Sequence, residues 1–206
     1  MASTASPYGL RAVNELGGLP YAGSTRSFLI DPAGYNTNIF NGSIVAINTS
    51  GYINIVTTNG DNSTPFPAGT IGVFVGCSFT NAQGQIIYSQ YYPANTASVQ
   101  GSAITAYVID DDRAVFQVQA NGTLAQTALG MNVILSAVQS TSTGSTTTGN
   151  STTAVSNSAA ATSGYAFRVV GFADTPGFSA VGDAFTDILV KFNPGAHSYS
   201  NATGVA

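Results

Sequence analysis

Short apolar runs alternate with turn residues along most of the chain from Phe28 onward. The runs are rich in Val, Ile, Phe and Tyr and are bounded by Gly, Asn, Asp and Pro, which is typical of β-strands. The run 71–79 is rich in Val, Ile and Phe and predicts a central strand. The other predicted strands are 44–47, 52–56, 85–92, 103–109, 114–119, 131–138, 165–172 and 186–192.

Turn signals connect these predicted strands at short intervals. Residues 48–51 and 110–113 each predict a hairpin connection. One short helix is expected near 123–130, because Thr123 and Gln126 have the capping-box spacing and Gly130 can end the turn. Strands separated by turns about every ten residues, with almost no helix, predict an all-β fold. We expect a β-sandwich or a β-barrel, jelly-roll-like in its organisation.

Residues 1–24 predict an extended N-terminal arm on a β-rich domain that spans 25–206. Gly and Pro interrupt the apolar residues of this segment, which excludes a long helix. The arm either packs as a strap on its own domain or docks on a neighbouring subunit. If the arm docks on a neighbouring subunit, we expect the domain to stay folded without residues 2–21. The expected contact residues are then Pro7, Tyr8, Leu10, Arg11, Leu16, Leu19 and Tyr21.

A tract made almost entirely of Ser, Thr, Gly, Asn and Ala occupies residues 139–164, without a charged residue. Such a composition does not build a core and predicts either a long exposed loop or a flat strand pair. The tract could mark a boundary between two lobes. Because strong strands are predicted on both sides of it, we favour one domain with an elaborated second half.

The small number of charges is the first functional clue. Of 206 residues, 7% are charged, against about 25% in ordinary soluble domains. The formal net charge of −4 leaves little to neutralise phosphates, so we expect no nucleic-acid partner. A surface with so few charges is either solvated by uncharged polar side chains or buried in an assembly. No apolar stretch approaches 18 residues and the N-terminus has no secretory pattern, so we expect no membrane partner and synthesis in the cytoplasm.

The inventory of catalytic and metal-binding side chains is thin. The single His197 is not accompanied by a nucleophile elbow, so we expect no enzymatic activity, no catalytic residue and no cofactor. The triplet Asp110–Asp112 offers oxygen ligands of the kind that Ca²⁺ takes. Neighbouring strand residues point to opposite faces, so we interpret the triplet as a solvated turn partly neutralised by Arg113, with no metal. Cys77 lies inside the run 71–79 and is expected to be a small buried apolar side chain.

Three tyrosines cluster in the run 85–92. Tyr88, Tyr91 and Tyr92 are expected on the sheet surface or at an interface.

Several segments, taken in order, resemble the capsid decoration, or cement, proteins of tailed bacteriophages, especially those of marine and cyanobacterial phages. None of these segments is a catalytic motif, and their order carries the resemblance. The segments are 7–11, 19–23, 38–42, 71–76, 106–111, 116–120, 182–185 and 189–193. The tract 139–164 matches nothing in that pattern.

The resemblance implies a structural protein that is added to the outer surface of the virion head and stabilises contacts between capsomers. Its implied partners are the major capsid protein and further copies of the chain, commonly as a homotrimer. Two alternatives remain. One is a secreted adhesin or carbohydrate-binding β-sandwich, with the tyrosine cluster as its platform. The other is a tail or fibre component of the same virion.

Overall fold

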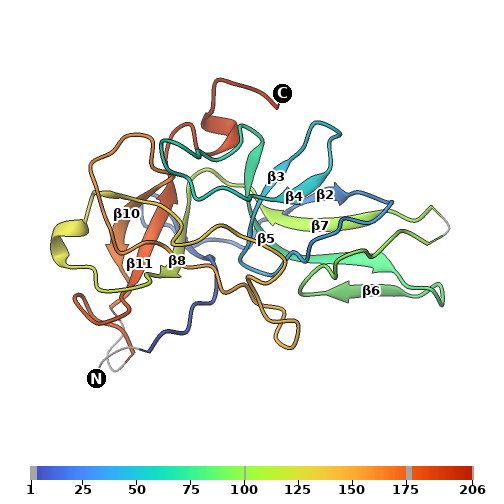
Figure 1. The fold of residues 1–206 in the computed structure, drawn as a ribbon, viewed down its shortest axis with the longest axis horizontal. Coiled ribbons are helices and arrows are strands. Elements are labelled where there is room, and N and C mark those ends of the chain that lie inside the picture. The colour runs from blue at the N-terminus through green and yellow to red at the C-terminus, as the bar shows by residue number, and fades with distance from the viewer. Residues whose placement is uncertain (1–3, 100, 175–177, 206) are drawn as a thin grey trace.

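The fold is built on antiparallel strands, with almost no helix. The computed structural model describes residues 4–99, 101–174 and 178–205. Two antiparallel sheets pack together as a β-sandwich, which confirms the predicted all-β class (Figure 1). Within the described residues neither sheet closes into a barrel.

The first sheet, sheet A, has five strands in the described part of the chain. In spatial order they are β1 (Arg11–Glu15), β8 (Ala114–Gln119), β11 (Asp187–Phe192), β10 (Phe167–Phe172) and β9 (Asn132–Val133). Strand β1 from the N-terminal segment thus lies beside β8 from the middle of the chain, and β8 lies beside β11 from near its end.

The second sheet, sheet B, has six strands in the described part of the chain. Its spatial order is β2 (Arg26–Ile30), β7 (Ile104–Ile109), β5 (Thr70–Thr80), β3 (Ile44–Ile47) and β4 (Ile53–Ile55), while β6 (Ile86–Ser89) pairs with the second half of β5. The strand β5 is therefore central, as the sequence predicts. The hairpin predicted at 110–113 is wrong, because this turn joins β7 of sheet B to β8 of sheet A, and the two strands do not pair.

The predicted helix at 123–130 is one turn of 3-10 helix, η1 (Gln126–Ala128). Its N-cap is Ala125 with no side-chain cap, so the expected capping box is wrong. A second 3-10 turn, η2 (Ser198–Ser200), lies near the C-terminus. Within the described residues, no helix has the length and apolar character needed to cross a membrane.

Two hydrophobic clusters lie on opposite faces of sheet B. The first fills the space between the sheets and joins Ile44 and Val73 of sheet B to Phe116 and Val190 of sheet A. The second covers the back of sheet B and is lined by Val45, Ile71, Phe74, Ala106, Val108, Ile39 and Tyr92. Consecutive β3 residues thus enter different cores, as the alternation of a strand requires. This part of sheet B is buried on both faces.

Gly72 permits a close approach of β5 to the end of β7. Its φ is +138°, and an added Cβ would lie 1.9 Å from the carbonyl oxygen of Ile109. A side chain there would be strained and would also collide with backbone. The pairing of β5 with β3 shifts register beside this residue, between Val45 and Ala46.

The tract 139–164 is an irregular segment without a regular strand pair, so that alternative is wrong. The loop alternative describes exposed stretches such as 146–148, whereas Gln139, Ser151 and 153–155 are buried. The Gln139 side chain accepts a hydrogen bond from the Ile44 N–H (2.8 Å) and donates to the carbonyls of Ile44 (3.0 Å) and Val56 (2.9 Å). Val155 belongs to the core between the sheets. The tract packs because its polar groups pair with buried backbone groups, which would otherwise be costly to bury.

Candidate functional site

The first half of the predicted arm belongs to its own domain. Strand β1 pairs with β8 and forms one edge of sheet A. Leu10 is 1% exposed in the core between the sheets. The Tyr8 hydroxyl donates to Asp187 Oδ1 at 3.2 Å, and the Arg11 guanidinium lies 4.6 Å from the centre of the Tyr8 ring. The docking hypothesis is therefore wrong for Leu10, and the strap alternative describes this stretch.

A glutamine side chain holds the start of the strap through two hydrogen bonds. Gln119 on β8 accepts from the Ser6 N–H (2.8 Å) and donates to the Thr4 carbonyl (3.2 Å). Burial raises the pKa of the Tyr8 hydroxyl, and the nearby Asp187 carboxylate adds to this effect. Tyr8 thus stays a neutral donor. The glycines and prolines that flank β1 conceal this strand in the sequence.

The second half of the predicted arm lies at the surface. The Glu15 N–H donates to the Leu19 carbonyl at 2.7 Å and closes a turn. Leu16 and Leu19 are 40% and 59% exposed. Tyr21 packs partly against the core between the sheets, and Pro7 is half-buried. The seven predicted contact residues therefore do not form one surface.

The three predicted interface tyrosines have three different environments. Tyr92 is fully buried; its hydroxyl accepts from the Tyr35 N–H (2.9 Å) and donates to the Thr96 carbonyl (2.7 Å). The interface prediction is wrong for Tyr92, because it holds two loops against sheet B. Tyr91 is half-buried, and its ring stacks on that of Phe40, with centroids 5.6 Å apart. Tyr88 on β6 is 76% exposed and fits the surface prediction.

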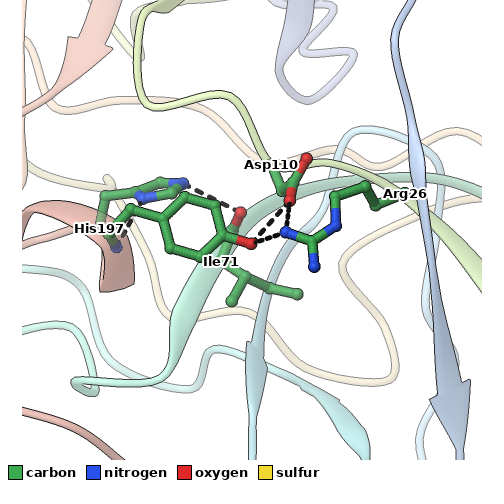
Figure 2. Close-up of polar contacts among 5 residues, drawn as sticks. Arg26, Ile71, Asp110 and His197 are labelled. Atoms are coloured by element: carbon green, nitrogen blue, oxygen red, sulfur yellow. Dashed lines mark hydrogen bonds and ion pairs between the residues drawn. The ribbon is translucent and has the colours of Figure 1, made fainter.

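A polar cluster joins the C-terminal segment to sheet B (Figure 2). Asp110 follows β7, is nearly buried, and accepts from Arg26 Nη1 (2.8 Å) and from the Tyr199 hydroxyl (2.7 Å). Arg26 also donates to the Tyr199 hydroxyl. Asp110 of the triplet Asp110–Asp112, which the sequence predicts to be a solvated turn, thus forms a structural ion pair. Its partner is Arg26, whereas the sequence suggested Arg113 as the neutralising residue.

His197 anchors the same segment from inside. The buried ring accepts from the Tyr199 N–H through Nδ1 (3.2 Å), so Nε2 carries the proton and donates to the Ile71 carbonyl (3.0 Å). Burial lowers the pKa of the His197 ring, against the opposing effects of the Ile71 hydrogen bond and of Asp110–Asp112. Neutral imidazole suits this pair of bonds, because each ring nitrogen has one partner.

A series of aromatic contacts connects the histidine to the core between the sheets. Phe192 at the end of β11 lies 5.8 Å from Phe116 and 5.5 Å from His197, both edge-on, measured between ring centroids. His197 in turn lies 5.1 Å from Tyr199. The polar cluster is thus the outer end of a packed aromatic row, and its geometry is that of a structural anchor.

The remaining candidate reactive and metal-binding side chains are either buried or do not converge on one site. Cys77 is buried, as predicted, and burial raises the pKa of its thiol to about 12, which disfavours the reactive thiolate. Among the described residues, no three His, Cys, Asp or Glu side chains gather as metal ligands. Asp111 accepts from the Arg113 N–H at 2.8 Å within the β7–β8 turn.

Comparison with protein-family models, with curated proteins and with solved structures finds no match for the chain.

The burial difference between two leucines of the N-terminal segment gives a direct test of the strap. Leu10→Ala removes a core side chain and is expected to lower the free energy of unfolding by about 2–5 kcal/mol. Leu19→Ala, at an exposed turn, is the matched control and should change it by less than about 0.5 kcal/mol. Chemical denaturation measures both. Equal effects of the two substitutions would contradict the strap.

The lowered pKa of His197 predicts a dependence of stability on pH. Its contribution to stability is fully present above the ordinary histidine pKa of 6.5 and is lost as the pH falls through the lowered value in the folded state. In His197→Gln the amide can still donate to Ile71 but does not titrate. We expect the wild-type protein to lose more stability than this variant between pH 7 and pH 5, measured by denaturation at each pH. Parallel curves for the two proteins would contradict the assignment.

Proposed function

We propose that the chain is a structural component of a phage head, which decorates the outer surface of the capsid and strengthens contacts between capsomers. The observation that carries this proposal is a surface with few charges that presents large apolar side chains on a completed β-sandwich. Leu19, Ile86, Tyr88 and Phe178 are 59%, 66%, 76% and 77% exposed, while 7% of the residues are charged. Side chains of this kind, exposed on a rigid fold, favour burial against other proteins.

The shape of the subunit also supports a role as an attached module. The accessible surface of the described chain is 9303 Å², close to the roughly 9,000 Å² expected for a compact monomer of this mass. The subunit thus completes its own core before it meets a partner. A homotrimer of such modules would attach to a symmetric shell through modest contacts, because its three linked copies bind together. The ordered resemblance of the segments to cement proteins agrees with this proposal.

A second candidate function is glycan binding. The exposed Tyr88 ring lies on a flat sheet face with the hydroxyl side chains of Ser78 and Thr105 in register beside it. An aromatic face with neighbouring hydroxyl groups can contact a sugar ring, and this arrangement favours glycan binding as the second candidate.

The location and copy number of the chain test the proposed function. Particles of the virus that encodes it are analysed by quantitative mass spectrometry and cryo-electron microscopy. We expect a copy number comparable with that of the major capsid protein and density on the outside of the head, grouped in threes if the chain is a homotrimer. A few copies at the tail would instead identify a fibre component. Absence from particles together with secretion into the medium would favour the glycan-binding alternative.

A further inference from the structure

Sheet B extends beyond the sandwich and leaves one of its faces uncovered. The second half of β5 pairs with β6 on one side and with β7 on the other, and β7 pairs with β2. These strands reach away from β8, β10 and β11 of sheet A (Figure 1). On their back face, Phe28, Cys77 and Ala106 belong to or pack against the second core. The front face continues the inter-sheet core, but within the described residues no strand of sheet A lies over it (Figure 1).

The strand register identifies the residues of this front face. Tyr88, Ser78, Thr105 and Leu29 lie opposite one another across the four strands. Their neighbours two residues along each strand lie on the same face. The complete front face comprises Ser27, Leu29, Ser78, Thr80, Ile86, Tyr88, Thr105 and Tyr107. It contains no charged residue.

Three large apolar side chains of the front face are exposed in the free chain. Leu29, Ile86 and Tyr88 are 48%, 66% and 76% exposed. The Tyr107 hydroxyl lies 3.1 Å from Ser78 Oγ on the same face, so its polar end already has a partner. The face therefore combines exposed apolar side chains with hydroxyl groups, and burying it against a protein would remove apolar area from water without desolvating a charge.

Charge and area together restrict what can cover this face. An ionic partner would lose hydration and gain no countercharge there. Four strands spaced about 4.8 Å apart, over about five residues of about 3.4 Å rise, give a footprint of about 300 Å². A stable pair of proteins in solution buries about 800 Å² on each side. A second copy of this chain docked on this face alone would therefore be held weakly, whereas a homotrimer attached to the shell would present three linked faces at once and bind by avidity.

We propose that the front face of sheet B, centred on Ile86 and Tyr88, is the surface by which the chain attaches to an uncharged region on the outside of the capsid shell. This inference rests on the proposed function and assigns it a contact surface. The face differs from the N-terminal segment, which the sequence suggested as the anchor and of which residues 4–15 pack on their own domain.

The test uses heads assembled without this chain, from a virus that lacks its gene, and measures binding of added protein by co-sedimentation. The double variant Ile86→Thr/Tyr88→Thr keeps residues that favour strands. The control is Leu129→Thr, since Leu129 is 48% exposed and lies beside η1, outside sheet B. Circular dichroism and denaturation establish that each variant is folded. We expect at least tenfold weaker binding for the double variant and less than a twofold change for the control.

Each alternative outcome overturns the proposal in a recognisable way. If wild-type protein and the double variant bind heads equally, the contact surface is wrong while the proposed function stands. If wild-type protein does not bind heads, the proposed function fails and this inference fails with it. If the double substitution abolishes self-association in sedimentation velocity and leaves head binding intact, the face belongs to a second copy. If it abolishes binding to a glycan array instead, the face is a sugar site.

Discussion

The structure depends on covering both faces of one half of sheet B. Along β5, Val73 enters the core between the sheets and the next residue, Phe74, enters the core behind sheet B. Each face needs its own layer, because buried apolar area is the main stabilising contribution to the fold. Sheet A covers one face, while loops that carry Ile39 and Tyr92 cover the other. The chain thus completes two cores around one strand.

The irregular segments are the coverings that this arrangement requires. The N-terminal strap adds β1 to sheet A and places Leu10 in the core. Gln139 forms hydrogen bonds with both the N–H and the carbonyl of Ile44 at the start of β3. The C-terminal segment is held by His197 and by the Asp110 cluster. In this charge-poor protein, hydrogen bonds from polar side chains thus connect the irregular segments to the sheets. The few charged side chains form local pairs such as that of Arg26 with Asp110.

The sequence predicts most of sheet B and much of sheet A, because alternation and turn residues are local signals. The predicted run 71–79 coincides with β5, and the residues before and after the 110–113 turn form β7 and β8. The sequence does not predict β1, since Gly9 and Gly17 flank it, nor the roles of Gln139 and His197, whose partners are distant in the chain. The burial of Tyr92 is likewise a consequence of tertiary packing, and its aromatic neighbours in sequence suggested a surface. The candidate contact face combines a predicted residue, Tyr88, with strands whose register only the structure supplies.

Amide hydrogen exchange on the isolated, monomeric chain tests the central claim that sheet B is sealed at one end and open at the other. The account predicts that the amides of Val73 and Phe74 exchange through global unfolding, because both neighbouring layers must separate to expose them. The amides of β6, at residues 86–89, should exchange faster through local opening, because one face of that strand is uncovered. Exchange of β6 as slow as that of Val73 and Phe74 would show that its open face is covered in the free protein and would contradict the account.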